Sequence, residues 1–422
     1  MKRFYFAALL AVVVALPGNA QTSEWENGFY TLPDAEDVGF MGLSISSDGH
    51  YISGTTSLGN MFIADVTTGE SKVIEGTSLE SCGVSDEGVA VGYLPNSYTP
   101  SAITFDLAGN TTNLEDEGTV SKANGITPDG KLIVGSVYTE HTQAAVWVDG
   151  ERTLLPESTD EWLGFESWGT EAKYASADGS VIVGSIMDIY ETYPAMVWVK
   201  NLDGSYSAWP ICRQCYEPEF GDNPYMIFMP TGISPNGRYI ALSLMPMWNF
   251  SYIPARFDVE TETIEVYTGS EISDIETTGV ADDGTIIGYV NGDMAVYGRK
   301  GIIWKAGDTP KYMSDVYPES TFTALESTTS SSNSPIQITA DGRYIVGYGS
   351  TDVATSMFTY VFDTESYSDD YIPGGVSKIE SEVSKATTKA VYTLDGKKLH
   401  DPLPGINILK RMDGSASKVL VK

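Results

Sequence analysis

The stretch Ile126–Ser136 reads ITPDGKLIVGS, and further along the chain Ala175–Ser185 reads ASADGSVIVGS. In both stretches an Asp-Gly pair precedes a short β-branched run that ends on glycine. Asp-Gly favours a tight turn, because glycine accepts the positive φ that such a turn requires. The β-branched run is typical of a short strand that is buried on both faces. Each stretch therefore predicts a turn that leads into a buried β-strand.

The same pattern occurs seven times along the chain. The other copies are Ile45–Gly54, Val84–Tyr93, Ile233–Leu242, Val280–Tyr289 and Ile338–Gly347. The turn glycines are spaced by 39 to 58 residues and are Gly49, Gly88, Gly130, Gly179, Gly237, Gly284 and Gly342. A period in this range indicates one supersecondary unit repeated along the chain, with each unit stacked on the next.

A second apolar strand follows each turn and usually ends on an aromatic residue. This aromatic lies 17 to 20 residues after the turn glycine and is Phe105, Trp147, Trp198, Phe257, Trp304 or Phe362, while Ala64 replaces it in the first copy. A further turn and a fourth short strand come next. The predicted fold is therefore all-β, a seven-bladed β-propeller of four-stranded blades with a small C-terminal β appendage. A β-sandwich would leave the similar units unexplained. We expect the aromatic column to form core between the blades.

The two ends of the chain predict further segments. Residues 1–20 combine a basic start, an apolar run that is short for a membrane span and a small-residue cleavage site, which is typical of a signal peptide. Residues 21–373 are assigned to the propeller, 374–389 to a linker and 390–422 to the C-terminal β segment. Nothing after the signal peptide is apolar for long enough to cross a membrane, so an exported protein is expected.

Closure of the ring requires a fourth strand in the last blade. Phe29–Pro33 resembles the fourth-strand text of other units although it precedes the first unit. We expect it to complete the last blade, because this pairing removes two open sheet edges. The competing donor is Asp370–Pro373.

Composition excludes some classes of partner. The 422 residues include 25 Lys and Arg against 57 Asp and Glu, a formal net charge of −32. Such a charge argues against nucleic acid and anionic lipid as partners, and favours solubility through self-repulsion. No calcium-loop motif is present, and no metal or cofactor is expected. In an oxidising compartment Cys212 and Cys215 can form a local disulfide, which leaves Cys82 over.

The long insertions are expected to share one face of the propeller. If the Asp-Gly turns join the first and second strands, they lie on one face, here called the turn face. The second-to-third and blade-to-blade connections lie on the opposite, long-loop face. Its insertions are rich in aromatics beside carboxylates, and the predicted binding residues are Trp162, Trp168, Tyr190, Tyr193, Tyr216, Phe220, Trp248 and Tyr252. Such rings can stack on sugars or anchor a protein partner; alternatively, they pack their own loops.

Catalytic signatures are weak in this sequence. His50, His141 and His400 lack metal-ligand spacing, and no nucleophile or phosphate-loop motif is present. Acid pairs such as Asp160 with Glu161, or Glu217 with Glu219, could serve a glycosidase. The favoured hypothesis is a non-enzymatic exported module that binds a glycan or an extracellular protein. The alternatives are a carbohydrate-active hydrolase or lyase and a structural component of the cell envelope.

The repeats resemble the extracellular HAF-type repeats and, most clearly in ISPNGRYIAL (233–242), the TolB-type propeller repeats. The resemblance covers about Val38 to Ser366 and departs from the pattern at Glu87, Asn236 and Ala64. It implies a propeller outside the cytoplasm and no catalytic residues. The tail, with Y-x-L-x-G-K-K from Tyr392 and a terminal KVLVK, resembles C-terminal sorting segments of Bacteroidetes surface and secreted proteins.

Overall fold

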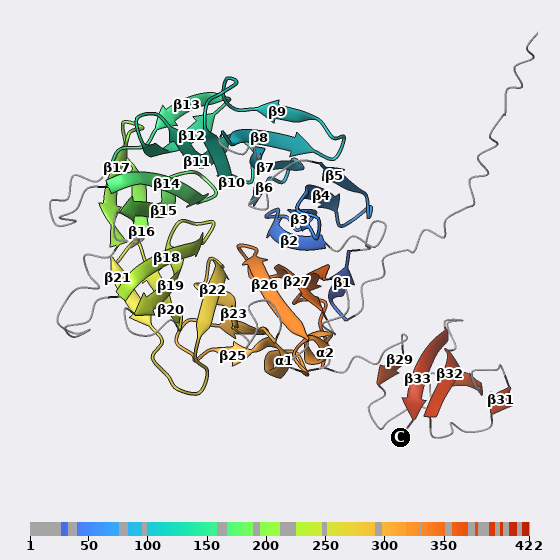
Figure 1. Cartoon of the computed structure of the whole chain (residues 1–422). Helices are drawn as coiled ribbons and strands as arrows, with labels where there is room; N and C mark the ends of the chain where they lie inside the picture. Colours follow the sequence, from blue (N-terminus) through green and yellow to red (C-terminus); the bar gives the residue numbers. More distant parts are fainter. Residues whose placement is uncertain are drawn as a thin grey trace, which may run out of the picture.

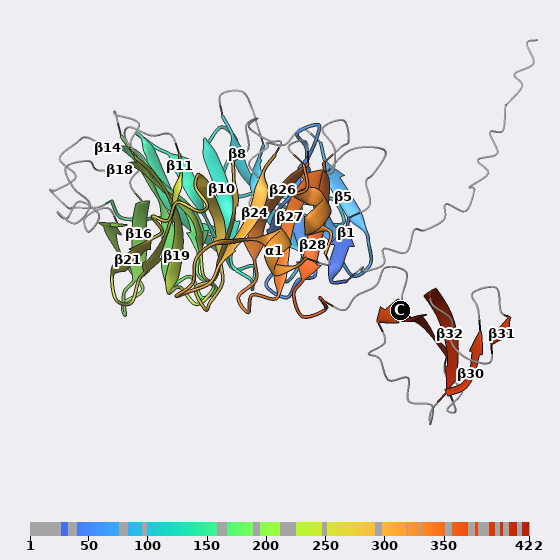
Figure 2. The same cartoon turned by 90° about the horizontal axis from the view of Figure 1, so that it is seen from below.

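The computed structural model describes residues 27–32, 40–75, 83–94, 99–157, 167–188, 195–211, 225–246, 251–291, 298–318, 320–328, 331–350, 357–369, 376–378, 388–392, 397–399, 405–411 and 416–421. Within these residues the chain is almost entirely β-structure, and its antiparallel sheets are arranged in a ring (Figure 1). Seen from the side, the strands run between the two faces of the ring (Figure 2). The predicted all-β propeller fold is confirmed.

Four sheets of the ring each consist of four strands that are consecutive in the described chain. One sheet contains β2 (Phe40–Ile45), β3 (Tyr51–Thr56), β4 (Met61–Asp65) and β5 (Ser71–Ile74), and the next contains β6 (Gly83–Val84), β7 (Val89–Leu94), β8 (Ser101–Asp106) and β9 (Thr111–Asn113). A third contains β18 (Tyr225–Ile233), β19 (Tyr239–Pro246), β20 (Ile253–Asp258) and β21 (Thr263–Val266). The fourth contains β22 (Ile275–Val280), β23 (Ile286–Val290), β24 (Lys300–Trp304) and β25 (Lys311–Tyr312). In each of them the first and second strands are joined by the expected glycine turn, which reads Asp48-Gly49, Glu87-Gly88, Asn236-Gly237 or Asp283-Gly284.

An eight-stranded sheet occupies the arc between β9 and β18. Its strands are β10 (Ser121–Ile126), β11 (Leu132–Tyr138), β12 (Thr142–Val148), β13 (Glu151–Leu154), β14 (Ser167–Ala175), β15 (Val181–Asp188), β16 (Ala195–Lys200) and β17 (Tyr206–Pro210). The halves β10–β13 and β14–β17 repeat the pattern of the other sheets. They are joined through one parallel pairing, between Thr142 and Gly169.

The last sheet of the ring combines both ends of the propeller. Its strands are β26 (Ser332–Ile338), β27 (Tyr344–Ser350), β28 (Phe358–Asp363) and β1 (Phe29–Thr31). β1 pairs antiparallel with β28, with Phe29 opposite Phe362. The ring of Phe29 stacks on Tyr360 at a centroid distance of 5.0 Å. The N-terminal strand therefore supplies the outer edge of this sheet and part of its core.

Two short helices, α1 (Met313–Val316) and α2 (Phe322–Leu325), precede β26, whereas the sequence analysis predicted no helix. Met313, Phe322 and Leu325 are buried against the last sheet. Apolar burial therefore holds this segment on the propeller, and Phe322 is not a surface group.

The Asp-Gly turns are held closed by hydroxyl side chains. The Ser46 hydroxyl donates to Asp48 Oδ1 at 2.6 Å and accepts the N–H groups of His50 and Tyr51 at 3.1 and 2.9 Å. Similar bonding occurs at Thr127, Ser176, Ser234 and Thr339. All the turn glycines have a positive φ, between 65° and 82°. The sequence-based account of these turns is confirmed.

A β-bulge recurs on the first strand of the sheets, six residues before the turn glycine. The bulged residues are Leu43, Asn124, Lys173, Thr231, Thr278 and Ile336. The neighbouring second strand usually carries a glycine opposite the bulge, where a Cβ would overlap a carbonyl oxygen of the first strand; these glycines are Gly54, Gly135, Gly184, Gly288 and Gly347. The glycine of the Ile-Val-Gly text therefore permits close backbone approach, as predicted.

The aromatic column forms core, as expected: Trp147, Trp198 and Trp304 are at most 1% exposed. Beyond the ring a five-stranded sheet contains β29 (Val376–Lys378), β30 (Thr388–Tyr392), β31 (Lys398–Leu399), β32 (Gly405–Arg411) and β33 (Ala416–Val421). Part of the segment assigned to a linker is thus a strand, because β29 pairs parallel with β33. The signal peptide assigned to residues 1–20 lies outside the described residues. None of the described helices has the length and hydropathy of a membrane span.

Candidate binding site at the centre of the ring

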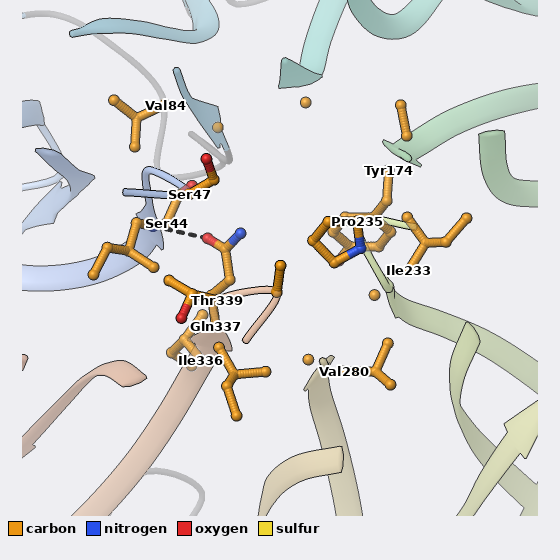
Figure 3. A pocket seen from close by; sticks show the side chains of 18 of the residues that line it. Ser44, Ser47, Val84, Tyr174, Ile233, Pro235, Val280, Ile336, Gln337 and Thr339 are labelled. Atoms are coloured by element: carbon orange, nitrogen blue, oxygen red, sulfur yellow. Dashed lines mark hydrogen bonds between the residues drawn. The ribbon is translucent and has the colours of Figure 1, made fainter. Parts of the chain in front are cut away.

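The first strand of each sheet lies closest to the centre of the ring, and these strands are here called the inner strands: β2, β6, β10, β14, β18, β22 and β26 (Figure 1). Their last residues before the Asp-Gly turns line a cavity of about 280 Å³ (Figure 3). The lining comes from segments within 43–47, 83–84, 125–128, 174–177, 231–235, 278–280 and 336–340. The cavity therefore lies toward the turn face, and every inner strand contributes to its wall.

The residue five positions before the turn glycine controls how closely neighbouring inner strands approach. At this position the lining has Gly83, Gly125, Gly232 and Gly279, but Ser44, Tyr174 and Gln337 in the other units. A Cβ on Gly125 would lie 2.9 Å from the carbonyl oxygen of Lys173 on the next inner strand, and one on Gly279 would lie 3.3 Å from that of Ile336. Glycine is therefore needed where two inner strands are close together.

Gln337 occupies the junction between the last and first inner strands. Its Oε1 accepts a hydrogen bond of 2.8 Å from the backbone N–H of Ile45 (Figure 3). The sequence analysis missed this column. A glycine five residues before the turn glycine in four of the units was the available signal.

The cavity wall is mainly apolar. One residue nearer the turn, the lining contains Ile45, Val84, Ile126, Ala175, Ile233, Val280 and Ile338. Hydroxyl and amide groups come from Ser44, Ser47, Thr231, Thr278, Thr339 and Gln337, while Tyr174 carries the one titratable side chain among the described lining residues. The Thr339 hydroxyl is already bonded to Asp341 and to the N–H of Tyr344. This wall suits recognition by shape and a few hydrogen bonds.

The mouth of the cavity is tied together by hydrogen bonds between neighbouring turns. The N–H of Asp86 donates to the carbonyl of Pro128 at 2.9 Å, and that of Ala177 to Pro235 at 2.7 Å. The Asp86 carboxylate also accepts from the Ser47 hydroxyl at 2.5 Å. Because these bonds join residues of different sheets, the rim is largely preorganised for a ligand.

Six of the eight predicted binding residues lie outside the part of the chain that the structure describes. Trp162, Tyr190, Tyr193, Tyr216, Phe220 and Trp248 lie outside the described residues, and Trp168 belongs to β14 without a described side chain. The acid pairs Asp160 with Glu161 and Glu217 with Glu219, and the three cysteines, also lie outside the described residues.

Tyr252 is the predicted binding residue whose surroundings are described. Its N–H donates to Asp274 Oδ1 at 2.8 Å, and its carbonyl accepts the N–H of Ile275 at 3.0 Å. Burial, and then the charges of Glu276 and Asp274, raise the pKa of Tyr252. An aromatic ring of the long-loop face therefore lies beside carboxylates at the start of β22.

The ring of antiparallel sheets around a lined central cavity defines the class of the protein, a β-propeller. No protein-family model matches the sequence, and no curated protein matches it. Among solved structures, the chain is similar to TolB from Acinetobacter baumannii, with 14% identity over 65% of this chain and 62% of that one and a TM-score of 0.41. The chain thus spans less than two thirds of that TolB.

Two further solved structures are similar along most of their length. The β-propeller domain of the Trilobed protease from Pyrococcus furiosus has 10% identity, covers 79% of this chain and 95% of its own, and has a TM-score of 0.49. Oligogalacturonate lyase from Vibrio parahaemolyticus has 14% identity, with 81% and 94% covered and a TM-score of 0.49. Similarity at this level identifies neither a ligand nor an activity.

Proposed function

We propose that this protein is an exported, non-enzymatic β-propeller binding module whose partner is an extracellular protein. The observation that carries the proposal is the lining of the central cavity, which combines apolar side chains with a few hydroxyl and amide groups. Pockets of this composition hold ligands by shape and by a small number of directed hydrogen bonds. The two hydrogen bonds at the rim, from Asp86 to Pro128 and from Ala177 to Pro235, preorganise the site for binding.

The cavity suits an apolar side chain better than a sugar. Its volume of about 280 Å³ is close to the lower end of ligand pockets, roughly 300 Å³. Each sugar hydroxyl buried without a partner costs about 1–3 kcal/mol, and few polar side chains line the wall. An aliphatic or aromatic side chain gains about 25 cal/mol for each Å² of apolar surface buried there.

A glycan bound on the long-loop face is the second candidate. The position of Tyr252 beside Asp274 and Glu276 favours it, because an aromatic ring can stack on a sugar while carboxylates accept its hydroxyl hydrogens. The predicted residues Trp162, Trp168, Tyr190, Tyr193, Tyr216, Phe220 and Trp248 would extend the same surface.

The remaining proposals concern blade number and export. Dividing the eight-stranded sheet at its parallel pairing between Thr142 and Gly169 supports seven four-stranded blades. The signal-peptide pattern of residues 1–20 supports export to the periplasm, cell surface or medium. The tail similar to Bacteroidetes sorting segments, and the HAF-type character of the repeats, support a place among surface or secreted proteins.

Blocking the cavity tests the proposal. A peptide display library and a glycan array are screened with the wild-type protein, with Ala340→Trp and with Leu202→Trp. Ala340 lines the cavity, whereas Leu202 is an exposed residue of the turn after β16 and serves as the matched control. We expect peptides with a shared apolar residue, whose binding is lost in Ala340→Trp and kept in Leu202→Trp. Binding to glycans alone, or peptide binding that Ala340→Trp leaves unchanged, would contradict the proposal.

A further inference from the structure

Arg299 differs from the other arginines whose side chains the structure describes. Arg152, Arg238, Arg256 and Arg343 each form an ion pair with a carboxylate. Among the described residues, no carboxylate oxygen lies within 4.0 Å of the Arg299 guanidinium. Arg299 is half-buried, and it lacks a counter-ion among the described residues although the chain has a formal net charge of −32. A charge held in this way is unfavourable unless something pairs with it.

The guanidinium of Arg299 is held in a fixed orientation. Its Cζ lies 4.2 Å from the centroid of the Tyr289 ring, and its Nη1 donates to the Tyr348 hydroxyl at 3.2 Å. Its Nε is buried and has no partner among the described residues. Stacking on an aromatic face fixes the plane of a guanidinium, which leaves its remaining donors directed.

Tyr348 adds a second donor at the same place. Its hydroxyl oxygen accepts from Arg299, so its own hydrogen remains available to a further acceptor. Tyr348 is half-buried on β27, and Arg299 directly precedes β24 in the connection from β23. By topology both residues lie toward the long-loop face, away from the central cavity. The site is therefore separate from the proposed apolar pocket.

Tyr289 completes the wall beneath the guanidinium. It is 6% exposed, and burial raises its pKa well above its usual value, with a smaller effect from Glu276. It therefore stays neutral at physiological pH and supports the cation with its ring face. A neutral side chain could bridge these two sheets equally well, so bridging alone does not explain the positive charge.

We propose that Arg299 and Tyr348 form a receptor for a carboxylate group of a ligand, between the sheet of β22–β25 and the sheet of β26–β28. The planar guanidinium matches a carboxylate with two parallel donors, and the tyrosine hydroxyl adds a third. The acidic surface repels anions in general. An anion is therefore bound only where directed donors offset this repulsion. A uronate sugar and a peptide share this carboxylate chemistry.

Matched acid and neutral probes test the receptor in the full chain. The probes are a tripeptide with a free C-terminal carboxylate, its C-terminal amide, a uronate disaccharide and its methyl ester, titrated by calorimetry. For the peptide or the sugar, the acid form is expected to bind about tenfold or more tightly than its neutral counterpart, as charge-assisted hydrogen bonds imply. The pair that shows the difference identifies the source of the carboxylate.

Substitutions then assign the effect to the two residues. Arg299→Gln is expected to abolish the preference for the acid form, while Arg299→Lys and Tyr348→Phe reduce it in part. Arg152→Gln, which removes the same charge from an exposed ion pair with Glu115, is expected to preserve it. Equal binding of acid and neutral forms, no binding of any probe, or a preference that survives Arg299→Gln would overturn the proposal. Circular dichroism confirms that each variant is folded.

Discussion

Gln337 accepts a hydrogen bond of 2.8 Å from the backbone N–H of Ile45, although 292 residues separate the two in sequence. The bond joins the inner strand of the last sheet to that of the first. On the outer side of the same sheet, β1 pairs with β28. On the turn face, the ring of Tyr344 packs on Gly49. Early and late parts of the sequence therefore meet at three places: between inner strands, at the outer edge of the last sheet and on the turn face.

Replacement of Gln337 tests the innermost of these contacts. Gln337→Met retains the length of the side chain but leaves the N–H of Ile45 without its acceptor, so the free energy of unfolding should fall by about 1–2 kcal/mol. Gln337→Glu retains the acceptor oxygen and should lose less. Urea unfolding of both variants at neutral pH measures the difference. A Met variant as stable as the wild type would show that the amide does not contribute to closure.

Removal of β1 tests the outermost contact. Phe29, Tyr30 and Leu32 are at most 4% exposed, and loss of their burial should cost about 5 kcal/mol or more. A chain that begins at Ala35 should therefore melt at least about 10 °C below one that begins at Asn27. Differential scanning calorimetry on the two chains decides the matter. Equal melting temperatures would mean that the ring closes without this strand.

Alanine substitutions at Gly49 and Gly307 separate the energetic cost of a side chain at positive φ from the cost of a steric clash. Both have a positive φ, of 79° and 74°, but a Cβ on Gly49 would lie 2.6 Å from the Tyr344 ring, whereas nothing lies within 4 Å of one on Gly307. Gly307→Ala should cost about 1 kcal/mol, and Gly49→Ala clearly more. Replacing Tyr344 by Ala in the Gly49→Ala background should relieve the clash and recover part of the lost stability. Equal losses in the two alanine variants would count against tight packing between the sheets.

Glu326 should make stability depend on pH. Its Oε1 accepts from Gly301 N and Asn333 Nδ2 at 3.0 and 2.6 Å, and its Oε2 from Ser314 N at 3.1 Å. Burial raises the pKa of this carboxyl despite these bonds. A raised folded-state pKa gives stability that is present below the unfolded value and is lost as pH rises through the folded value.

The advantage of the wild type over Glu326→Gln should therefore be larger near pH 4 than near pH 7. Urea unfolding of both proteins at the two pH values provides the comparison, and the other carboxyl groups cancel in the difference. An advantage that grows toward neutral pH would show that the three donors outweigh burial.

The features that could be predicted from the sequence are those set by residues close together in the chain. The Asp-Gly turns, the strands after them and the buried column with Trp147 depend on neighbouring residues, so their pattern is visible in one dimension. α1 and α2 were missed because four residues are too few to show helical periodicity. The glycine column with Gly125 was missed because its cause lies on the next inner strand, across a sheet boundary. Of the predicted binding surface, Tyr252 alone is placed with its surroundings, so that surface stays a prediction.

The most direct test of the account is a crystal structure of the full chain with a peptide selected from the display library. The account predicts a closed ring with one apolar side chain of the peptide inside the central cavity, between Tyr174 and Gln337. A peptide bound elsewhere with the cavity unfilled, or an open arrangement of the sheets, would contradict it.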